Sequence, residues 1–142
     1  MADANREISR RIIEEIFSQG RMETADELIA PGAITHDPAQ PNATPGPQGV
    51  KESAGIYRGG FPDLSISIDD QCAEDDLVCT RWTAKGTNTA DFWGMSATGK
   101  QATVTGITID RIEGGQVVES WTNWDALGLL QQLGVIPAQA PA

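Results

Sequence analysis

The N-terminal part of the chain carries its apolar side chains at the spacing of an α-helix. Over residues 3–19 they recur every three or four positions, as Ile8, Ile12, Ile13, Ile16 and Phe17. The same pattern predicts a short helix at about 22–29 and a third helix from Pro47 to about Tyr57. The intervening segment AQPNATPGPQG is rich in Pro, Gly and Asn, which predicts a loop.

From Leu64 onward the apolar period becomes two, which is typical of β-strands. Leu64, Ile66 and Ile68 alternate with polar residues and predict a half-buried strand. Three further strands are predicted at LVCTRWTAKGT, QATVTGITIDRI and QVVESWTNW, the last two joined by the tight-turn sequence Glu113-Gly114-Gly115. A helix from about Asp125 to Leu133 follows, and the tail from about residue 138 is expected to fray.

Helices followed by consecutive strands predict an α+β fold in a single domain spanning residues 1–142. We expect a cone, in which the N-terminal helices pack on a strongly curved, mainly antiparallel sheet and a short C-terminal helix closes the end. Such a cone leaves space between the sheet and the helices, and this space is a natural ligand pocket.

Charge and composition narrow the classes of partner. Ten Lys and Arg against twenty Asp and Glu give a formal net charge of −10. A field of this sign repels phosphate backbones and anionic lipids, so we expect no nucleic-acid and no membrane partner. No apolar run of about 18 residues is present, and a cytoplasmic location is expected. A single histidine and no CxxC pair argue against a metal site.

Strict alternation assigns the side chains of the last strand to two faces. Val117, Glu119, Trp121 and Asn123 share one face, which we expect to line the pocket. The other face of the sheet is expected to form a homodimer contact, because its row of side chains includes two isoleucines that would otherwise be exposed to solvent. That row comprises Thr103, Thr105, Ile107, Ile109, Val118, Ser120, Thr122 and Trp124.

The chain resembles the SnoaL-like polyketide cyclases, also called ester cyclases, of the nuclear-transport-factor-2-like fold. The resemblance rests on the order of HDP, GPQGVKE, FPDLSISIDD, VCTRWTAKGT, GMSATGK, GITIDRIEGGQVVESW and LGLLQQLG, over about residues 5–137. It implies a cone fold, a homodimer, and a pocket for a small hydrophobic, polyketide-like molecule. It also implies intramolecular aldol closure by general acid–base catalysis, without a cofactor.

The resemblance also shows where this chain departs from the family. In the founding cyclases a catalytic Asp on the last strand directly precedes a Trp, and the matching position here is Asn123. A His on the preceding strand is matched by Thr108, and a nearby pocket Gln by Gly106. An amide donates and accepts hydrogen bonds but cannot shuttle a proton, so the acid–base set of the family is missing at these positions.

Three residues are therefore candidates for the chemistry, and each of them, like the neighbouring Asp37, has a structural alternative. Asn123 is expected in the pocket, or as a buried amide satisfied by the backbone. His36, whose ordinary pKa lies near neutrality, is expected either in the pocket or in a solvated loop. Asp125 is either catalytic or the N-cap of the last helix. Asp37 either orients the imidazole of His36 or starts a turn before Pro38.

The expected substrate pocket is completed by Gly106, Thr108 and a set of aromatic walls. The walls are Tyr57, Trp82, Trp93 and Trp121, and the loop carrying Phe92, Trp93 and Met95 is either a lid or ordinary packing. The leading hypothesis is aldol cyclisation of a polyketide-like carbonyl compound. The alternatives are another chemistry on the same scaffold, such as accessory hydroxylation or epoxide opening, and a non-catalytic domain that binds a small ligand.

Overall fold

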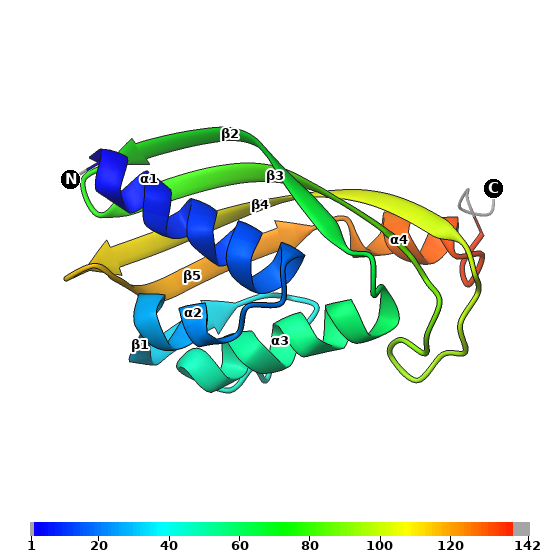
Figure 1. Ribbon diagram of the computed structural model, residues 1–142. Helices are drawn as coiled ribbons and strands as arrows, with labels where there is room; N and C mark the ends of the chain where they lie inside the picture. The colour runs from blue at the N-terminus through cyan, green and yellow to red at the C-terminus, as the bar shows by residue number, and fades with distance from the viewer. Residues whose placement is uncertain (1, 138–142) are drawn as a thin grey trace.

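The computed structural model describes residues 2–137 and contains an open, five-stranded mixed sheet with helices on one face (Figure 1). The α+β fold expected from the sequence is confirmed. The expected frayed tail from about residue 138 lies outside the described residues. The elements, in chain order, are α1 (Ala2–Arg11), η1 (Ile12–Ser18), α2 (Glu23–Leu28), β1 (Ile29–His36), α3 (Pro47–Gly60), β2 (Ser65–Glu74), β3 (Leu77–Thr87), β4 (Gln101–Glu113), β5 (Gln116–Trp124) and α4 (Ala126–Gln132).

The strands β2 to β5 form an antiparallel meander, and β1 is added at the far edge to give the order β1-β5-β4-β3-β2. Gly114 and Gly115, both with positive φ, form the tight turn between β4 and β5. Strand β1 pairs parallel to β5 and was not predicted from the sequence. Its Pro31-Gly32 pair reads as a break, but an edge strand tolerates a proline because one side of its backbone needs no partner.

The first predicted helix is continuous in the chain but changes its winding at Ile12. Residues 12–18 form a π-helix, in which each turn holds more residues than an α-helical turn. Ile12 and Ile13 are consecutive, yet both are buried at 8% exposure and both line the cavity described below. The wider winding therefore directs two neighbouring side chains toward the interior.

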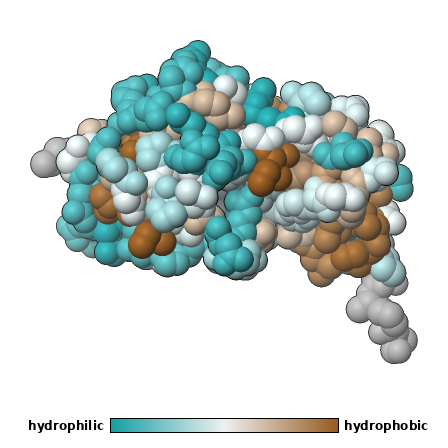
Figure 2. All heavy atoms as spheres, turned by 90° about the horizontal axis from the view of Figure 1, so that it is seen from below, coloured by the Kyte–Doolittle hydropathy of each residue, from teal (hydrophilic) through white to brown (hydrophobic). Residues whose placement is uncertain are grey.

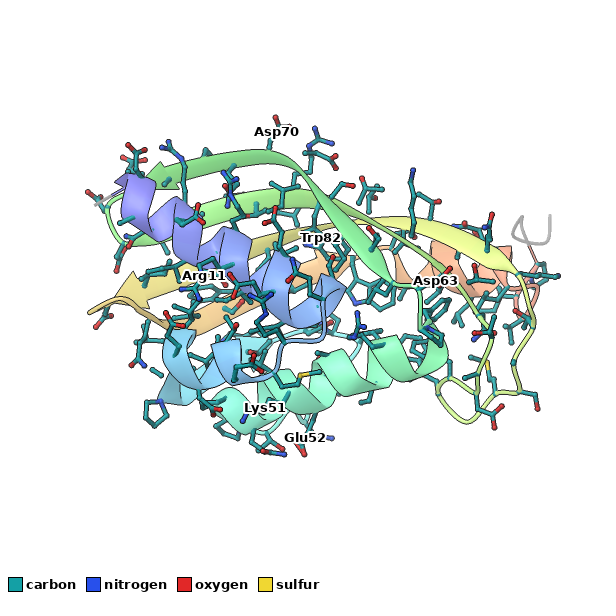
Figure 3. The ribbon with its side chains drawn as sticks, in the orientation of Figure 1. Arg11, Lys51, Glu52, Asp63, Asp70 and Trp82 are labelled. Carbon is teal, nitrogen blue, oxygen red and sulfur yellow. The ribbon has the colours of Figure 1, made fainter. Side chains whose placement is uncertain are left out.

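The helices define an inner face and an outer face of the sheet. Helices α1 and η1 pack on β2 and β3, α3 packs on η1 and β1, and α4 packs on β4. Buried apolar side chains form two clusters, one around Ile16, Leu28 and Val78 and the other around Phe61 and Leu129. Figure 3 shows Trp82 directed from β3 toward the helices, whereas Asp70 on β2 points away from them.

The surface on the helix side is largely polar. Figure 2 shows hydrophilic side chains over most of this view and apolar side chains gathered at the C-terminal end. Leu127 and Val135, which belong to that end of the chain, are 56% and 47% exposed. Within residues 2–137, no helix combines the length and apolar character needed to cross a membrane.

Candidate active site

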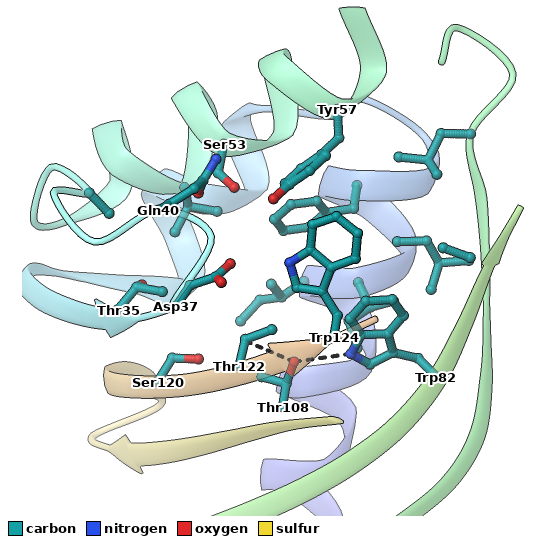
Figure 4. A pocket seen from close by; sticks show the side chains of 18 of the residues that line it. Thr35, Asp37, Gln40, Ser53, Tyr57, Trp82, Thr108, Ser120, Thr122 and Trp124 are labelled. Carbon is teal, nitrogen blue, oxygen red and sulfur yellow. Dashed lines mark hydrogen bonds between the residues drawn. The ribbon is translucent and has the colours of Figure 1, made fainter. Parts of the chain in front are cut away.

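A cavity of about 180 Å³ lies between the inner face of the sheet and the helices. Its apolar part is formed mainly by side chains of η1, β2, β3 and β4, including Phe17, Ile66 and Trp82, and by Phe61 directly after α3. Its polar part is formed mainly by β1, the segment after β1, α3, β4 and β5. Figure 4 labels most of the polar side chains that line it, which are Thr35, Asp37, Gln40, Ser53, Tyr57, Thr108, Ser120 and Thr122. Asp110 and the exposed Lys85 also line it.

A β-bulge at Val118 decides which side chains of β5 reach this cavity. Ile112 of β4 pairs with Val117, whereas Arg111 pairs with Glu119, so Val118 is an extra residue in β5. An extra residue exchanges the two faces for every position that follows. Val117 therefore points inward, as do Ser120, Thr122 and Trp124 beyond the bulge.

The expectation that Trp121 and Asn123 line the pocket is wrong for this reason. Strict alternation placed them on the face of Val117, but the bulge places Glu119, Trp121 and Asn123 on the outer face of the sheet. Asn123 is exposed and borders a shallow depression formed with Arg81 and Ile107. It therefore lies on the opposite side of the sheet from the cavity.

His36 lies on the same outer face. Strand β1 pairs with β5 so that His36 is opposite Trp121, and the two rings stack with centroids 5.5 Å apart. The Nε2 atom of His36 is 2.7 Å from Oε2 of Glu119, and the His36 side chain is 47% exposed. The expectation of His36 as a polar group of the pocket is therefore wrong, because it is the neighbours Thr35 and Asp37 that point inward.

Asp37, rather than His36, is the titratable side chain at this end of β1 that lines the cavity. It follows the last residue of β1, is half-buried, and its Oδ1 accepts a hydrogen bond of 2.8 Å from the Ala39 N–H. Burial raises the pKa of Asp37, while the Ala39 N–H and the indole of Trp124 oppose this shift. The turn expected before Pro38 is thus present, and it holds a carboxyl group with an elevated pKa inside an apolar cavity.

Tyr57 reaches the cavity from α3 and faces Asp37. Its Oη is buried and makes no well-oriented hydrogen bond to the described residues. Burial, together with the nearby Asp37 carboxylate, raises the pKa of Tyr57 above its ordinary value, although Trp124 acts in the opposite direction. Tyr57 is therefore a neutral hydroxyl across the physiological pH range, free to donate a hydrogen bond to a ligand.

Trp124 connects these two polar groups with the aromatic wall of the cavity. Figure 4 shows its indole nitrogen directed toward Asp37 and Tyr57. Its ring meets Tyr57 edge-on, with centroids 5.5 Å apart. Strict alternation predicts Trp124 on the dimer face, and the bulge at Val118 again accounts for the difference.

Trp82 and Thr108 form the floor of the cavity. The Nε1 of Trp82 donates to Oγ1 of Thr108 at 3.1 Å, and Thr108 Oγ1 lies 3.0 Å from Oγ1 of Thr122. Gly106 lies beneath the indole, which covers it, so Gly106 does not itself reach the cavity. Tyr57, Trp82 and Thr108 thus lie in the lining.

Trp93 supports the cavity from outside its lining. It stacks on Phe92 with ring centroids 4.4 Å apart, and its ring lies 5.9 Å from that of Trp124 and 6.4 Å from that of Tyr57. The segment that carries it is anchored by the buried Asn88, whose amide bonds the Gly60 and Ala90 carbonyls. Trp93 therefore packs behind two residues that line the cavity.

Asp125 acts as the N-cap of α4. Its Oδ1 accepts a hydrogen bond of 2.8 Å from the Gly128 N–H, and its side chain is exposed on the border of the outer depression. The structural alternative considered for Asp125 is therefore the one realised, and Asp125 does not line the cavity.

Asp110 is a second carboxyl group in the lining, and it is buried at 5% exposure. Ser9 and Ser120 each donate a hydroxyl to it, at 2.8 Å. Burial raises the pKa of Asp110 and the two hydroxyls oppose the shift. Because its oxygens are engaged by protein hydroxyls, Asp110 is less available to a ligand than Asp37. Between residues 2 and 137, no three His, Cys, Asp or Glu side chains are placed to hold a metal ion.

Sequence reasoning missed Asp37 as a cavity residue, although the signal was present. His36 and Asp37 stand side by side in THDP, and consecutive residues of an extended chain point to opposite sides. Only one of the two could enter the pocket. With β1 read as a loop, nothing in the pattern indicated which one.

The comparisons with known proteins agree with this architecture and confirm the resemblance. The family model of the SnoaL-like polyketide cyclases matches residues 7–133. IdmH from Streptomyces antibioticus, a proposed polyketide cyclase, is 33% identical with a TM-score of 0.79, over 92% of this chain and 99% of that one.

Two further solved structures are similar over nearly their whole length. A proposed polyketide cyclase from Acidithiobacillus ferrooxidans is 32% identical with a TM-score of 0.82, covering 92% of this chain and 94% of that one. TsrD from Streptomyces laurentii is 25% identical with a TM-score of 0.83, covering 94% and 97%. No curated protein sequence matches this chain.

Proposed function

Because the chain belongs to the SnoaL-like polyketide cyclase family, we propose that it closes a ring in a small hydrophobic carbonyl compound by an aldol reaction in which Asp37 transfers the proton. The observation that carries this proposal is the Asp37 carboxyl group. It opens into an apolar cavity, faces Tyr57 and Trp124, and has a pKa raised by burial. A raised pKa brings a carboxyl group closer to the operating pH, which suits a general base or acid.

The reaction needs one group that first accepts and then returns a proton. The Asp37 carboxylate removes a proton from the carbon between two carbonyl groups. The resulting enolate carbon forms a C–C bond to another carbonyl carbon of the same molecule. The new alkoxide oxygen then takes the proton back from the Asp37 carboxylic acid. No electrons are gained or lost overall, so this reaction requires no cofactor.

The neighbours of Asp37 can stabilise the charge that develops. Among residues 2–137 the Tyr57 hydroxyl has no partner of good geometry, and it can donate to the enolate oxygen. The indole N–H of Trp124 faces the same side of the cavity and favours the ionised form of Asp37. These roles replace the acid–base roles that the sequence analysis gave to His36, Asn123 and Asp125.

Substitution of Asp37 tests the proposal directly. The substrate is a β-keto ester whose remaining carbonyl group lies within reach of ring closure, and the measured quantity is the rate of ring formation. Asp37→Asn removes the proton carrier and keeps the side-chain size, so kcat is expected to fall about 10²–10⁴-fold. Asp37→Glu should retain part of the activity.

His36→Asn is the matched control, because it changes the preceding residue on the other side of the sheet. It is expected to leave the rate of ring closure unchanged. Full activity of Asp37→Asn would overturn the proposed chemistry. Tight binding of the ligand without turnover in the wild type would instead favour the alternative of a non-catalytic binding domain.

We also propose that the chain forms a homodimer through the outer face of the sheet. Ile34, Ile107 and Ile109 lie on this face and are 51%, 46% and 37% exposed. Exposed isoleucines from two strands on one face of the sheet favour a covering partner. The contribution of β5 to this face is Glu119, Trp121 and Asn123 rather than Ser120, Thr122 and Trp124, because of the bulge.

A further inference from the structure

We infer that Trp82 is a specificity-determining residue that restricts the substrate to carbonyl compounds with one ring or at most two. The inference rests on the proposed function for the type of compound, but the size limit itself follows from the geometry of the cavity floor.

The indole of Trp82 is held flat across the sheet by its neighbours. Trp82 on β3 pairs with Gly106 on β4, and a Cβ atom at position 106 would lie 2.2 Å from Cζ2 of Trp82. Only glycine leaves room for the ring there. The hydrogen bond from Nε1 to Thr108 Oγ1, 3.1 Å long, fixes the other side of the indole. The indole ring of Trp82 therefore forms a rigid part of the cavity floor.

The cavity space that Trp82 leaves free is small compared with ordinary ligand pockets. The cavity measures about 180 Å³. An apolar cavity of about 150 Å³ in another protein holds a single benzene ring, whereas pockets for drug-sized ligands span roughly 300–1,000 Å³. One ring fits inside this space together with the carbonyl groups that react, whereas three or more fused rings would have to project out of its mouth or displace its lining.

The arrangement of the lining also orients such a compound. Figure 4 shows Asp37 and Trp82 on two sides of the cavity, with Thr108, Thr122 and Trp124 between them. A ring packed against Trp82 and Trp124 places an attached β-dicarbonyl chain toward Asp37. A larger ring system would need the space that the indole of Trp82 fills.

The test is a series of β-keto esters that differ only in their aryl group, with phenyl, naphthyl and anthraquinone members. Dissociation constants are measured by calorimetry for the wild type and Trp82→Ala. The wild type is expected to bind the phenyl member and to show no binding of the anthraquinone member. Trp82→Ala should gain at least about tenfold in affinity for the anthraquinone member, which is what a single misplaced methylene costs in an apolar pocket.

Trp121→Ala is the matched control, since it removes an indole from the outer face and should leave the size preference unchanged. Trp82→Phe, which retains an aromatic ring, serves if the alanine variant does not fold, and it should admit the naphthyl member more readily. The inference is overturned if the wild type binds the anthraquinone member as tightly as the phenyl member. The inference is also overturned if the wild type binds no member of the series, or if Trp82→Ala shows the same size preference as the wild type.

Binding in this series requires no turnover, so its outcome is independent of the role of Asp37. A size preference that depends on Trp82, found together with a fully active Asp37→Asn, would refute the proposed chemistry and leave the size limit in place. The reverse combination would refute only the size limit.

Discussion

His36 and Asp37 are consecutive in the chain, yet their side chains lie on opposite sides of the sheet. His36 stacks on Trp121 and contacts Glu119 on the outer face, whereas Asp37 lines the cavity on the inner side. The residue with the more familiar acid–base chemistry is thus outside the site. The neighbouring carboxyl group, which burial has made a weaker acid, is inside it.

The pH dependence of ring closure should report Asp37 rather than His36. Asp37 removes a proton only when it is ionised, and its pKa is raised by burial. The rate kcat/KM is therefore expected to fall as the pH is lowered through a value above that of an ordinary aspartate, about 3.9. His36→Asn should show the same profile as the wild type. Loss of the ionisation in His36→Asn would contradict the assignment.

Asn123→Asp should leave the catalytic rate unchanged. The new carboxyl group would lie on the exposed outer face, beside Arg81 and Ile107, where no substrate is expected. Within a single chain, surface substitutions of this kind change the free energy of unfolding by less than about 0.5 kcal/mol. The measurements are kcat/KM for ring closure and chemical unfolding. A clear gain in rate would mean that the substrate reaches the outer face.

Asp110→Asn should raise the free energy of unfolding, and the gain over the wild type should grow as the pH rises. Burial raises the pKa of Asp110 in the folded protein, so the folded state holds this proton more tightly than the unfolded chain does. Stability from this group is present below the pKa of an ordinary aspartate and is lost as the pH rises through the raised folded value. An asparagine amide can still donate to one of Ser9 and Ser120 and accept from the other.

The quantity to measure is the difference in unfolding free energy between Asp110→Asn and the wild type from acid to neutral pH. It should rise in favour of the variant over that range. A difference that stays constant with pH would mean that Asp110 titrates as an exposed aspartate does. Asp110→Ala serves as a comparison, because it leaves both serine hydroxyls without their partner, at a cost of about 1–3 kcal/mol.

Ile107→Glu should dissociate the proposed homodimer. Ile107 is 46% exposed on the outer face, and a carboxylate there would have to lose its hydration at the contact. Sedimentation velocity at micromolar concentration is expected to show a dimer for the wild type and a monomer for the variant. Ile56→Glu is the matched control, because Ile56 is similarly exposed, at 44%, but lies on α3. A wild type that is entirely monomeric would refute the proposal.

Much of the fold follows from local patterns in the sequence. The change of apolar period near Leu64 separates the helical part from the strands, and the Gly114-Gly115 turn sets the β4–β5 hairpin. The cap of the last helix at Asp125 follows from a short-range hydrogen bond that the local sequence already contains. These features depend on residues only a few positions apart, which is why they can be predicted without a structure.

The composition of the site was decided by long-range pairing. Strand β1 forms because it pairs with β5, which lies more than eighty positions further along the chain. His36, for example, is opposite Trp121. The sequence of β1 itself contains a Pro-Gly pair, which predicts a break. The bulge at Val118 arises from the register between β4 and β5, and a shift of one residue exchanges the faces of all that follows. The sequence by itself determined that a polar and aromatic strand would end at Trp124. The tertiary structure decided that Thr122 and Trp124 face the cavity while Asn123 faces outward.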